Sequence, residues 1–348
     1  MVLSRYSEMG ASSRLRMFQY LPYLRDDWDV HVAPFFHDGY LQALYSGRRD
    51  FLEIAAGYVR RLSAAFGLRR FDLAWVEAEL FPWIPWGIEK LLAAKAVPLA
   101  ADYDDAIFHR YDRHPSAATR RLLGGKIGAL MQQAKTVLAG NEYIASYASA
   151  AGASRVHVVP TVIDTSRYEP RSGRTSRQLT IGWIGTPKTQ HYLDLVAGAL
   201  EFAHRRLHAR IVVIGAAGNP LPSTPVEVRP WNEGTEAADL AALDVGIMPL
   251  AESPWELGKC GYKLIQYMAC GKPVVASPVG VNRQLVEHGT TGYLASGPEE
   301  WINAFRLLHD DANRAAEMGR AGRAKVERDY SLAAAAPRVR RILGEAIS

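Results

Sequence analysis

The residues best suited to chemistry lie between Ala251 and Gly280, where a loop rich in Pro, Trp and Gly leads into an apolar helical pattern and then an apolar strand. The helix is expected to begin after Gly261, because a glycine-containing loop at a helix start presents backbone N–H groups with no helical partner. The helix dipole adds partial positive charge there, and Lys259 and Lys263 add full charges. This combination predicts a site for a phosphate or diphosphate.

A second turn of the same kind follows the apolar stretch from Leu179 to Ile184, where Gly185, Thr186 and Pro187 precede Lys188. A helix expected from about Gln190 would place another helix start beside a lysine, which favours a second contact with an anion. A surface charge is the alternative interpretation of Lys188.

Acidic residues end another apolar stretch, from Pro98 to Asp105, which reads as a buried strand. Ligands of parallel sheets lie beyond the carboxyl ends of the strands, so Asp104 and Asp105, with His109 just after them, are candidates to orient or deprotonate a hydroxyl group. Helix capping and salt bridges are the alternative. Asp102 and Asp104 also form a literal Asp-x-Asp pair, for which we rank metal binding low.

Two further features are open to a functional and a structural interpretation. A glycine–serine loop around Gly10 precedes a helical pattern over 14–24, with Ser12 or Ser13 as the expected N-cap and Arg14 as a candidate anion contact or a solvated charge. Trp231 follows a predicted strand and would either stack on a planar ligand or pack in the core.

Alternating strands and helices predict parallel, doubly wound sheets. The chain of 348 residues suits two domains, and its formal net charge of +5 fits an anionic ligand or acidic membrane surface but does not argue for nucleic acid. Two cysteines in no metal pattern and no apolar leader favour a reducing cytosol.

The expected strands cover 28–36, 71–77, 98–105, 136–140, 155–160, 179–184, 210–215, 226–231, 245–249 and 273–277. The expected helices cover 14–24, 51–66, 82–94, 126–134, 141–150, 240–244, 262–270 and 281–289, and the sequence over 299–347 is expected to be mostly helical.

The run from Gln266 to Val275, QYMACGKPVV, resembles the "E-A-M-A-C-G-x-P-V-V" segment of retaining glycosyltransferases of family 4. That family usually has two glutamates eight positions apart. Gln266 stands at the second position, and its amide oxygen can still accept a hydrogen bond from a ribose hydroxyl. Gly258 stands at the first, so Glu256 becomes the candidate for the donor-sugar contact. Trp183 replaces a family arginine, and Lys188 matches a family lysine.

The resemblance implies an α/β chain of the GT-B fold: two Rossmann-like doubly wound parallel-sheet domains that face an interdomain cleft. We expect an acceptor-side domain over 1–168, a nucleotide-sugar domain over 169–331 with a linker near 171–178, and a helix over 332–348 that crosses back. The implied catalytic residues are Lys188, Lys263, Asp104, Asp105 and His109; the implied donor-binding residues are Gly10, Arg14, Gly185, Trp231, Glu256, Lys259, Cys260, Gly261, Tyr262 and Gln266.

The implied function is transfer of a hexosyl or related sugar from a nucleotide diphosphate sugar to a hydroxyl acceptor, with retention. The acceptor would be a polysaccharide, a lipid-linked glycan or another glycoconjugate. No cofactor and no metal are expected. A cytoplasmic location is expected, with peripheral contact to an anionic membrane through the Trp-Pro cluster of residues 81–86 or through Arg338, Arg340 and Arg341 as an option. Two alternatives stay open: a nucleotide-sugar epimerase of the same fold, and a weakly catalytic nucleotide-sugar-binding subunit.

Overall fold

The computed structural model describes residues 1–45, 47–48, 50–91, 97–171 and 178–347. By their internal contacts the residues form two compact units. Unit 1 comprises Met1–Thr161, Gly258–Cys260 and Ala335–Ser348, and unit 2 comprises Val162–Leu257 and Gly261–Ala334. The chain passes from unit 1 to unit 2 at Thr161, whereas the sequence predicted a boundary at 168. The predicted linker lies almost entirely outside the described residues.

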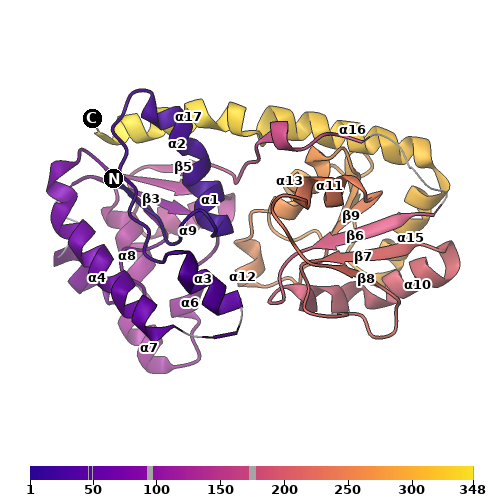
Figure 1. Cartoon of the computed structure of the whole chain (residues 1–348), viewed down its shortest axis with the longest axis horizontal. Coiled ribbons are helices and arrows are strands. Elements are labelled where there is room, and N and C mark those ends of the chain that lie inside the picture. The colour runs from indigo at the N-terminus through magenta and orange to yellow at the C-terminus, as the bar shows by residue number, and fades with distance from the viewer. Residues whose placement is uncertain (46, 49, 92–96, 172–177, 348) are drawn as a thin grey trace. The chain divides into compact units, whose positions relative to one another are not determined.

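Unit 1 is built on a parallel five-stranded sheet of order β1-β2-β3-β4-β5 (Figure 1). Each strand pairs in parallel with its neighbour along the sequence, so all five carboxyl ends lie at one edge. The strands are short and almost wholly buried, which explains their near-continuous apolar sequences. They are β1 (Val2–Leu3), β2 (Ala74–Glu77), β3 (Leu99–Tyr103), β4 (Thr136–Ala139) and β5 (Val156–Val158).

The helical segments of unit 1 range from single turns to the 17-residue helix α4. They are α1 (Ala11–Arg16), η1 (Phe18–Tyr20), α2 (Leu21–Arg25), α3 (Asp38–Tyr45), α4 (Phe51–Gly67), η2 (Leu68–Arg70), α5 (Trp86–Glu89), α6 (His109–Asp112), α7 (Ala117–Leu123), α8 (Lys126–Gln133) and α9 (Glu142–Ala150).

Unit 2 contains a parallel six-stranded sheet of order β11-β10-β9-β6-β7-β8. The chain starts in the middle of this sheet, at β6, runs to one edge and later returns to the other side of β6. Such a reversal defines the switch point at which doubly wound sheets bind ligands. The strands are β6 (Thr180–Ile184), β7 (Arg210–Ile214), β8 (Glu227–Arg229), β9 (Val245–Met248), β10 (Val274–Ala276) and β11 (Gly292–Leu294).

Helices cover both faces of the unit 2 sheet. Ile181 and Trp183 of β6 belong to one core cluster and Ile184 belongs to the other, as the two-residue period of a strand requires. The segments are η4 (Thr165–Arg167), η5 (Gln190–Val196), α10 (Ala197–Leu207), α11 (Glu236–Ala241), α12 (Pro254–Leu257), α13 (Tyr262–Ala269), α14 (Asn282–Leu285), α15 (Pro298–Asp310) and α16 (Ala312–Asp329).

The last helix, α17 (Leu332–Ile347), begins in unit 2 and belongs to unit 1 from Ala335 onward. Its Arg340 forms an ion pair with Asp27, and Arg341 pairs with Glu345. Within the described ranges, no helix combines the length and the apolar character that crossing a membrane requires.

Most predicted elements are present, with ends that differ by a few residues. Four predicted elements were wrong. The helix expected over 281–289 is the single turn α14. The stretch 28–36 forms only isolated bridges, at Val32 and Phe36. The helix expected over 14–24 is broken into α1, η1 and α2. The helix expected over 82–94 is the single turn α5 in the part of it that the structure describes.

Candidate active site

The amino-terminal end of α13 lies in unit 2, and its geometry follows from one glycine. Gly261 adopts φ +68°, and an added Cβ would lie 2.2 Å from Leu285 Cδ1. Both facts exclude an L side chain from this position. No side chain caps the helix end at Gly261, so the positive end of the helix dipole is not neutralised by a capping carboxylate. Gly271, at the other end of α13, has φ +69°, as the sequence predicted.

Lys263 is the second residue of α13. Its Nζ lies 4.4 Å from the ring centroid of Trp183. Trp183 is fully buried in β6. A cation over an indole face is attracted by the ring quadrupole, so the tryptophan that replaces the family arginine fixes the position of a lysine. The sequence identified both residues but not their contact.

The Gly185 turn fits the same tryptophan. A Cβ on Gly185 would lie 2.2 Å from the Trp183 ring, so glycine is required for close packing. Thr189 then closes the turn by accepting a hydrogen bond from the Thr186 N–H at 3.1 Å. The helix expected from about Gln190 begins there as the 3-10 segment η5 and continues as α10. Hydrogen-bond geometry is poorer in a 3-10 turn than in an α-helix, which weakens this end as an anion site. Lys188 is exposed at this turn.

Glu256, on α12, is buried and accepts hydrogen bonds from the hydroxyl groups of Tyr192 and Ser253. A buried carboxylate is stable only with such donors. Tyr192 belongs to η5, which follows the turn that carries Lys188. Its hydrogen bond to Glu256 therefore connects that turn to the loop before α13. The structure places Glu256 in unit 2, as its predicted role requires; the donor-sugar contact itself stays a prediction.

A second hydrogen-bonded group in unit 2 surrounds Trp231. Its indole N–H donates to Glu236 at 2.6 Å, and Tyr168 donates to the other oxygen of Glu236 at 2.6 Å. Burial and the neighbouring Tyr262 and Glu236 raise the pKa of Tyr168, while a hydrogen bond with Gln266 opposes this. Trp231 remains 41% exposed, and its stacking on a ligand stays a prediction. Sequence reasoning missed Glu236 and Tyr168.

In unit 1, Asp105 lies just beyond β3 and forms an ion pair with Lys259, with an Nζ–Oδ1 distance of 3.0 Å. Burial raises the pKa of Asp105 to about 6 against the opposing effect of the lysine. The segment Gly258–Cys260 belongs to unit 1, where the amide of Asn141 donates to the carbonyl of Gly258. The Cys260 thiol donates to the carbonyl of Asp104, and burial raises its pKa to about 12.

Glu77, at the carboxyl end of β2, was missed in the sequence. It accepts hydrogen bonds from the hydroxyls of Ser12 and Ser13 and from the N–H of Arg5, at 2.6–2.7 Å. The Ser12 hydroxyl oxygen also lies 2.8 Å from Asp104, so its single hydrogen is shared between acids at two strand ends. Burial raises the pKa of Glu77, with Asp104 adding to the effect. The predicted helix cap at Ser12 or Ser13 was wrong: Gly10 is the N-cap of α1, and both serines serve this carboxylate.

Asp102 is committed to a structural ion pair. Its Oδ1 lies 2.7 Å from Arg16 Nε, and both side chains are buried. Of the Asp-x-Asp pair, Asp102 therefore points into unit 1. Within the described parts of the chain, no three His, Cys, Asp or Glu side chains are grouped as a metal site would require.

His109, on α6, has both ring nitrogens engaged. Nδ1 lies 2.9 Å from Asp112 Oδ1, and Nε2 lies 2.8 Å from the Tyr143 hydroxyl. The ring also packs against Phe108. To act on a substrate, this histidine would first have to release one of these partners.

Gly10 and Arg14 follow the carboxyl end of β1, and they differ in what they contact. A Cβ on Gly10 would lie 2.3 Å from the Tyr6 Cβ, so the glycine permits a tight turn. Arg14 projects from α1 and donates to the carbonyl of Glu8 at 3.4 Å. Ligand contact at either residue stays a prediction.

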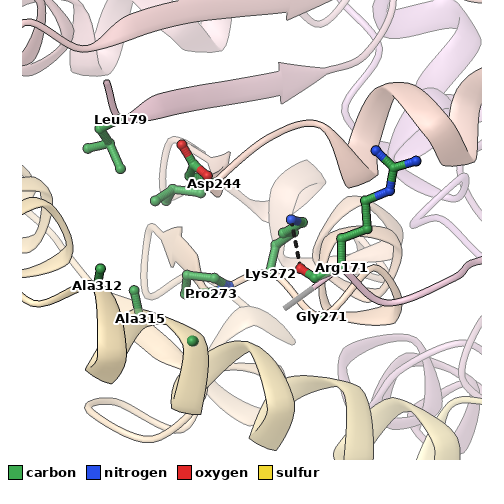
Figure 2. A pocket seen from close by; sticks show the side chains of 10 residues that line it. Arg171, Leu179, Asp244, Gly271, Lys272, Pro273, Ala312 and Ala315 are labelled. Atoms are coloured by element: carbon green, nitrogen blue, oxygen red, sulfur yellow. Dashed lines mark hydrogen bonds between the residues drawn. The ribbon is translucent and has the colours of Figure 1, made fainter. Parts of the chain in front are cut away.

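Two hollows lie away from these residues. Figure 2 shows a small one in unit 2, lined by Leu179, Asp244, Pro273 and their neighbours, where Lys272 Nζ donates to the Arg171 carbonyl at 3.0 Å. It lies at the amino ends of β6, β9 and β10. The other hollow, in unit 1, has a volume of about 840 Å³ and is lined by Val2, Trp75 and residues of α4. Both lie opposite the edge at which parallel sheets bind ligands.

Known proteins are similar to this chain in sequence and in fold. Residues 178–311, within unit 2, match the family model described as "Glycosyl transferases group 1". D-inositol 3-phosphate glycosyltransferases are similar: the one from Pseudarthrobacter chlorophenolicus is 32% identical over 37% of this chain and 28% of its own length. The one from Thermobispora bispora is 28% identical over 62% and 55%, respectively. The chain thus spans between about a quarter and about half of these curated relatives.

Solved structures extend the similarity to the whole chain. HepE from Anabaena, whose structure was solved in complex with UDP, aligns over 99% of both chains with a TM-score of 0.73 at 16% identity. Sucrose-phosphate synthase from Thermosynechococcus elongatus aligns over 85% of this chain and 79% of its own, with a TM-score of 0.65 at 16% identity. Residues 178–311 are thus similar to glycosyl transferases of group 1, and the whole chain is similar in fold to these structures. The predicted GT-B fold and the predicted resemblance to family 4 glycosyltransferases are confirmed.

Proposed function

We propose that the chain transfers a sugar from a nucleotide diphosphate sugar to a hydroxyl group of an acceptor, with retention at the anomeric carbon. The observation that carries the proposal is the uncapped start of α13 with Lys263 held on Trp183, inside the region that matches the glycosyl transferases group 1 model. A helix end and a fixed lysine suit the negative charge that gathers on a departing diphosphate.

The other donor contacts follow from the hydrogen-bonded groups of unit 2. Trp231, held through its N–H by Glu236, offers a face on which a nucleobase would stack. Gln266 would meet the ribose, and Glu256 would meet the donor sugar. Because Glu256 already accepts two hydroxyl hydrogen bonds, its remaining lone pairs would take the sugar hydroxyl.

Asp104 and Asp105 would serve the acceptor hydroxyl. A carboxylate whose pKa is raised to about 6 is closer to the ideal for a general base near neutral pH than an ordinary aspartate. Lys259, as the ion-pair partner of Asp105, would hold this carboxylate in place. The acceptor would be a glycan or a lipid-linked saccharide. No cofactor or metal is part of the proposal, so transfer should persist in EDTA.

A thermal-shift panel of UDP-, GDP-, dTDP- and ADP-sugars, followed by a nucleotide-release assay with and without candidate acceptors, tests the proposal. UDP-sugars come first in the panel because the similar HepE structure contains UDP. Acceptor-dependent release of the nucleotide with a retained anomer is the expected result. Interconversion of free donor sugars without an acceptor would point to an epimerase instead. Binding without release would point to a nucleotide-sugar-binding subunit.

A further inference from the structure

The outer face of α4 in unit 1 is strongly apolar. Leu52, Val59 and Phe66 are 85%, 69% and 71% exposed, and Phe51 at the helix start is 71% exposed. The first three are seven residues apart and therefore lie on one side of the helix. Ala55 and Ser63 lie between them on the same side, so that no charged residue interrupts the stripe.

The opposite side of α4 already supplies the contacts that hold the helix to unit 1. Gly57, Arg61 and Ala65 are buried, and Ile54, Tyr58 and Leu62 pack against the core of the unit. A helix that is apolar all round is normally buried all round, whereas this helix lies on the outside of its unit (Figure 1). Large apolar side chains gathered on a surface indicate a contact that the unit itself does not provide.

In the sequence, basic residues outnumber acidic ones at both ends of the stripe: Arg48 and Arg49 against Asp50, and Arg69 and Arg70 against Asp72. Arg48 precedes α4, and Arg69 and Arg70 follow it in η2; all three are exposed. The acidic residue of the helix body, Glu53, is paired with Arg60. Apolar side chains between positive ends are the pattern of a helix that lies in the interface of an anionic membrane.

We propose that α4 is the surface by which this protein docks on anionic lipid, with Leu52, Val59 and Phe66 in the acyl boundary and Arg48, Arg69 and Arg70 on the headgroups. Charge argues against a second copy of the chain as the occupant, since antiparallel pairing of two α4 faces would bring arginines against arginines. Two of the α17 arginines, which the sequence offered as one option for a membrane contact, are paired with carboxylates: Arg340 with Asp27 and Arg341 with Glu345. The proposed docking does not depend on sugar transfer, which is assayed separately.

Sedimentation of the full chain with vesicles tests the proposal without donor or acceptor. One vesicle is phosphatidylcholine alone, and the other is phosphatidylcholine and phosphatidylglycerol in equal parts. We expect binding to the second, weakened by salt. Combining Leu52→Gln, Val59→Gln and Phe66→Gln should lower the partition coefficient about 1,000-fold, because each side chain removed from the acyl boundary costs on the order of tenfold. Combining Arg69→Ser and Arg70→Ser should weaken binding about 30-fold, since each arginine near an anionic surface contributes about 1 kcal/mol.

Leu122→Gln is the matched control, because Leu122 is also 69% exposed in unit 1 but lies on α7. It should bind vesicles as the wild type does. Thermal melting should be nearly unchanged for all these surface variants, which separates docking from folding. Equal sedimentation of the wild type and the triple glutamine variant would overturn the proposal. So would a wild-type dimer, seen by analytical ultracentrifugation, that the glutamines dissociate.

Discussion

The carboxyl edges of the two sheets are built alike but are equipped for opposite tasks. In unit 1 the strand ends carry Glu77, Asp104 and Asp105, each held by a serine hydroxyl or by a lysine. In unit 2 the corresponding edge carries the start of α13, with Lys263 fixed on Trp183. Parallel sheets put ligands at this edge in both cases, and the side chains at the strand ends decide which ligand it is.

The two edges also differ in how they treat charge. In unit 1, burial raises the pKa of Glu77 and Asp105, because desolvation disfavours the ionised form. Such carboxylates are suited to accept a proton. In unit 2, Lys263 and the start of α13 lie together and would bind an anion by charge alone, without a proton transfer. We therefore expect substitutions in unit 2 to weaken the stabilisation of the leaving diphosphate. Substitutions in unit 1 should instead change how stability and rate depend on pH.

The largest effect should come from Lys263→Ala, which removes the cation stacked on Trp183. We expect kcat/KM for the donor to fall by about 100-fold or more, as happens when one donor to a developing anion is lost. Lys263→Arg should keep much of the rate, because a guanidinium also stacks on an indole. If steady-state assays show an unchanged rate for Lys263→Ala, the start of α13 does not bind the diphosphate, and the proposed difference between the two sheet edges is wrong.

The next largest effect should come from Trp231→Ala, which removes the proposed stacking surface. Loss of a base–aromatic stack typically costs about 1–3 kcal/mol, so the donor dissociation constant should rise about tenfold or more in calorimetry. Trp231→Phe, which keeps a ring but loses the hydrogen bond to Glu236, should lie in between. Equal affinity of the alanine variant and the wild type would show that Trp231 serves packing only.

Gly261→Ala should destabilise unit 2, because φ +68° and the contact at 2.2 Å with Leu285 both oppose a Cβ. Strain at such a position costs about 1–3 kcal/mol, which lowers Tm by several degrees. Gly297→Ala is the control: its φ of −119° is ordinary and the space around it is open. Matching melting curves for the two variants would contradict this account of the start of α13.

The smallest effect concerns pH and unit 1. With the pKa of Asp105 raised to about 6 in the folded chain, the folded state binds the proton more tightly than the unfolded state does. The stability contributed by this group is therefore greatest below the unfolded pKa and is lost as pH rises from about 4 through 6. Asp105→Asn should flatten this part of the Tm–pH curve. If Asp105 is also the base, the low-pH limb of kcat/KM should disappear in the same variant.

Local patterns predicted much of the scaffold. The helix over 51–66 is α4, because its apolar residues recur with helical spacing and Asp50 caps its first turn. The strand over 71–77 is β2, and the left-handed end of α13 falls at Gly271. The stretch 28–36 failed as a strand, because strand formation needs a partner along its whole length and only two bridges form.

The candidate site was predicted in its residue types but not in its partners. The sequence contains Ser12, Glu77 and Asp104 far apart, and nothing local indicates that one serine hydroxyl lies within hydrogen-bond distance of both acids. The sequence named Lys259 as a donor contact, which stays a prediction, and nothing local indicates that this lysine pairs with Asp105. Nor does any local pattern show that Trp183 would lie beneath Lys263.

The periodicity, the glycine turns and the family segment around α13 could all be found in the amino-acid sequence, because they depend on backbone preferences and neighbouring residues. Which charges meet, and which apolar face of α4 stays outside, became known from the folded chain alone. Hydrogen bonds, ion pairs and burial join residues distant along the chain, and their pairing is set when the sheets assemble.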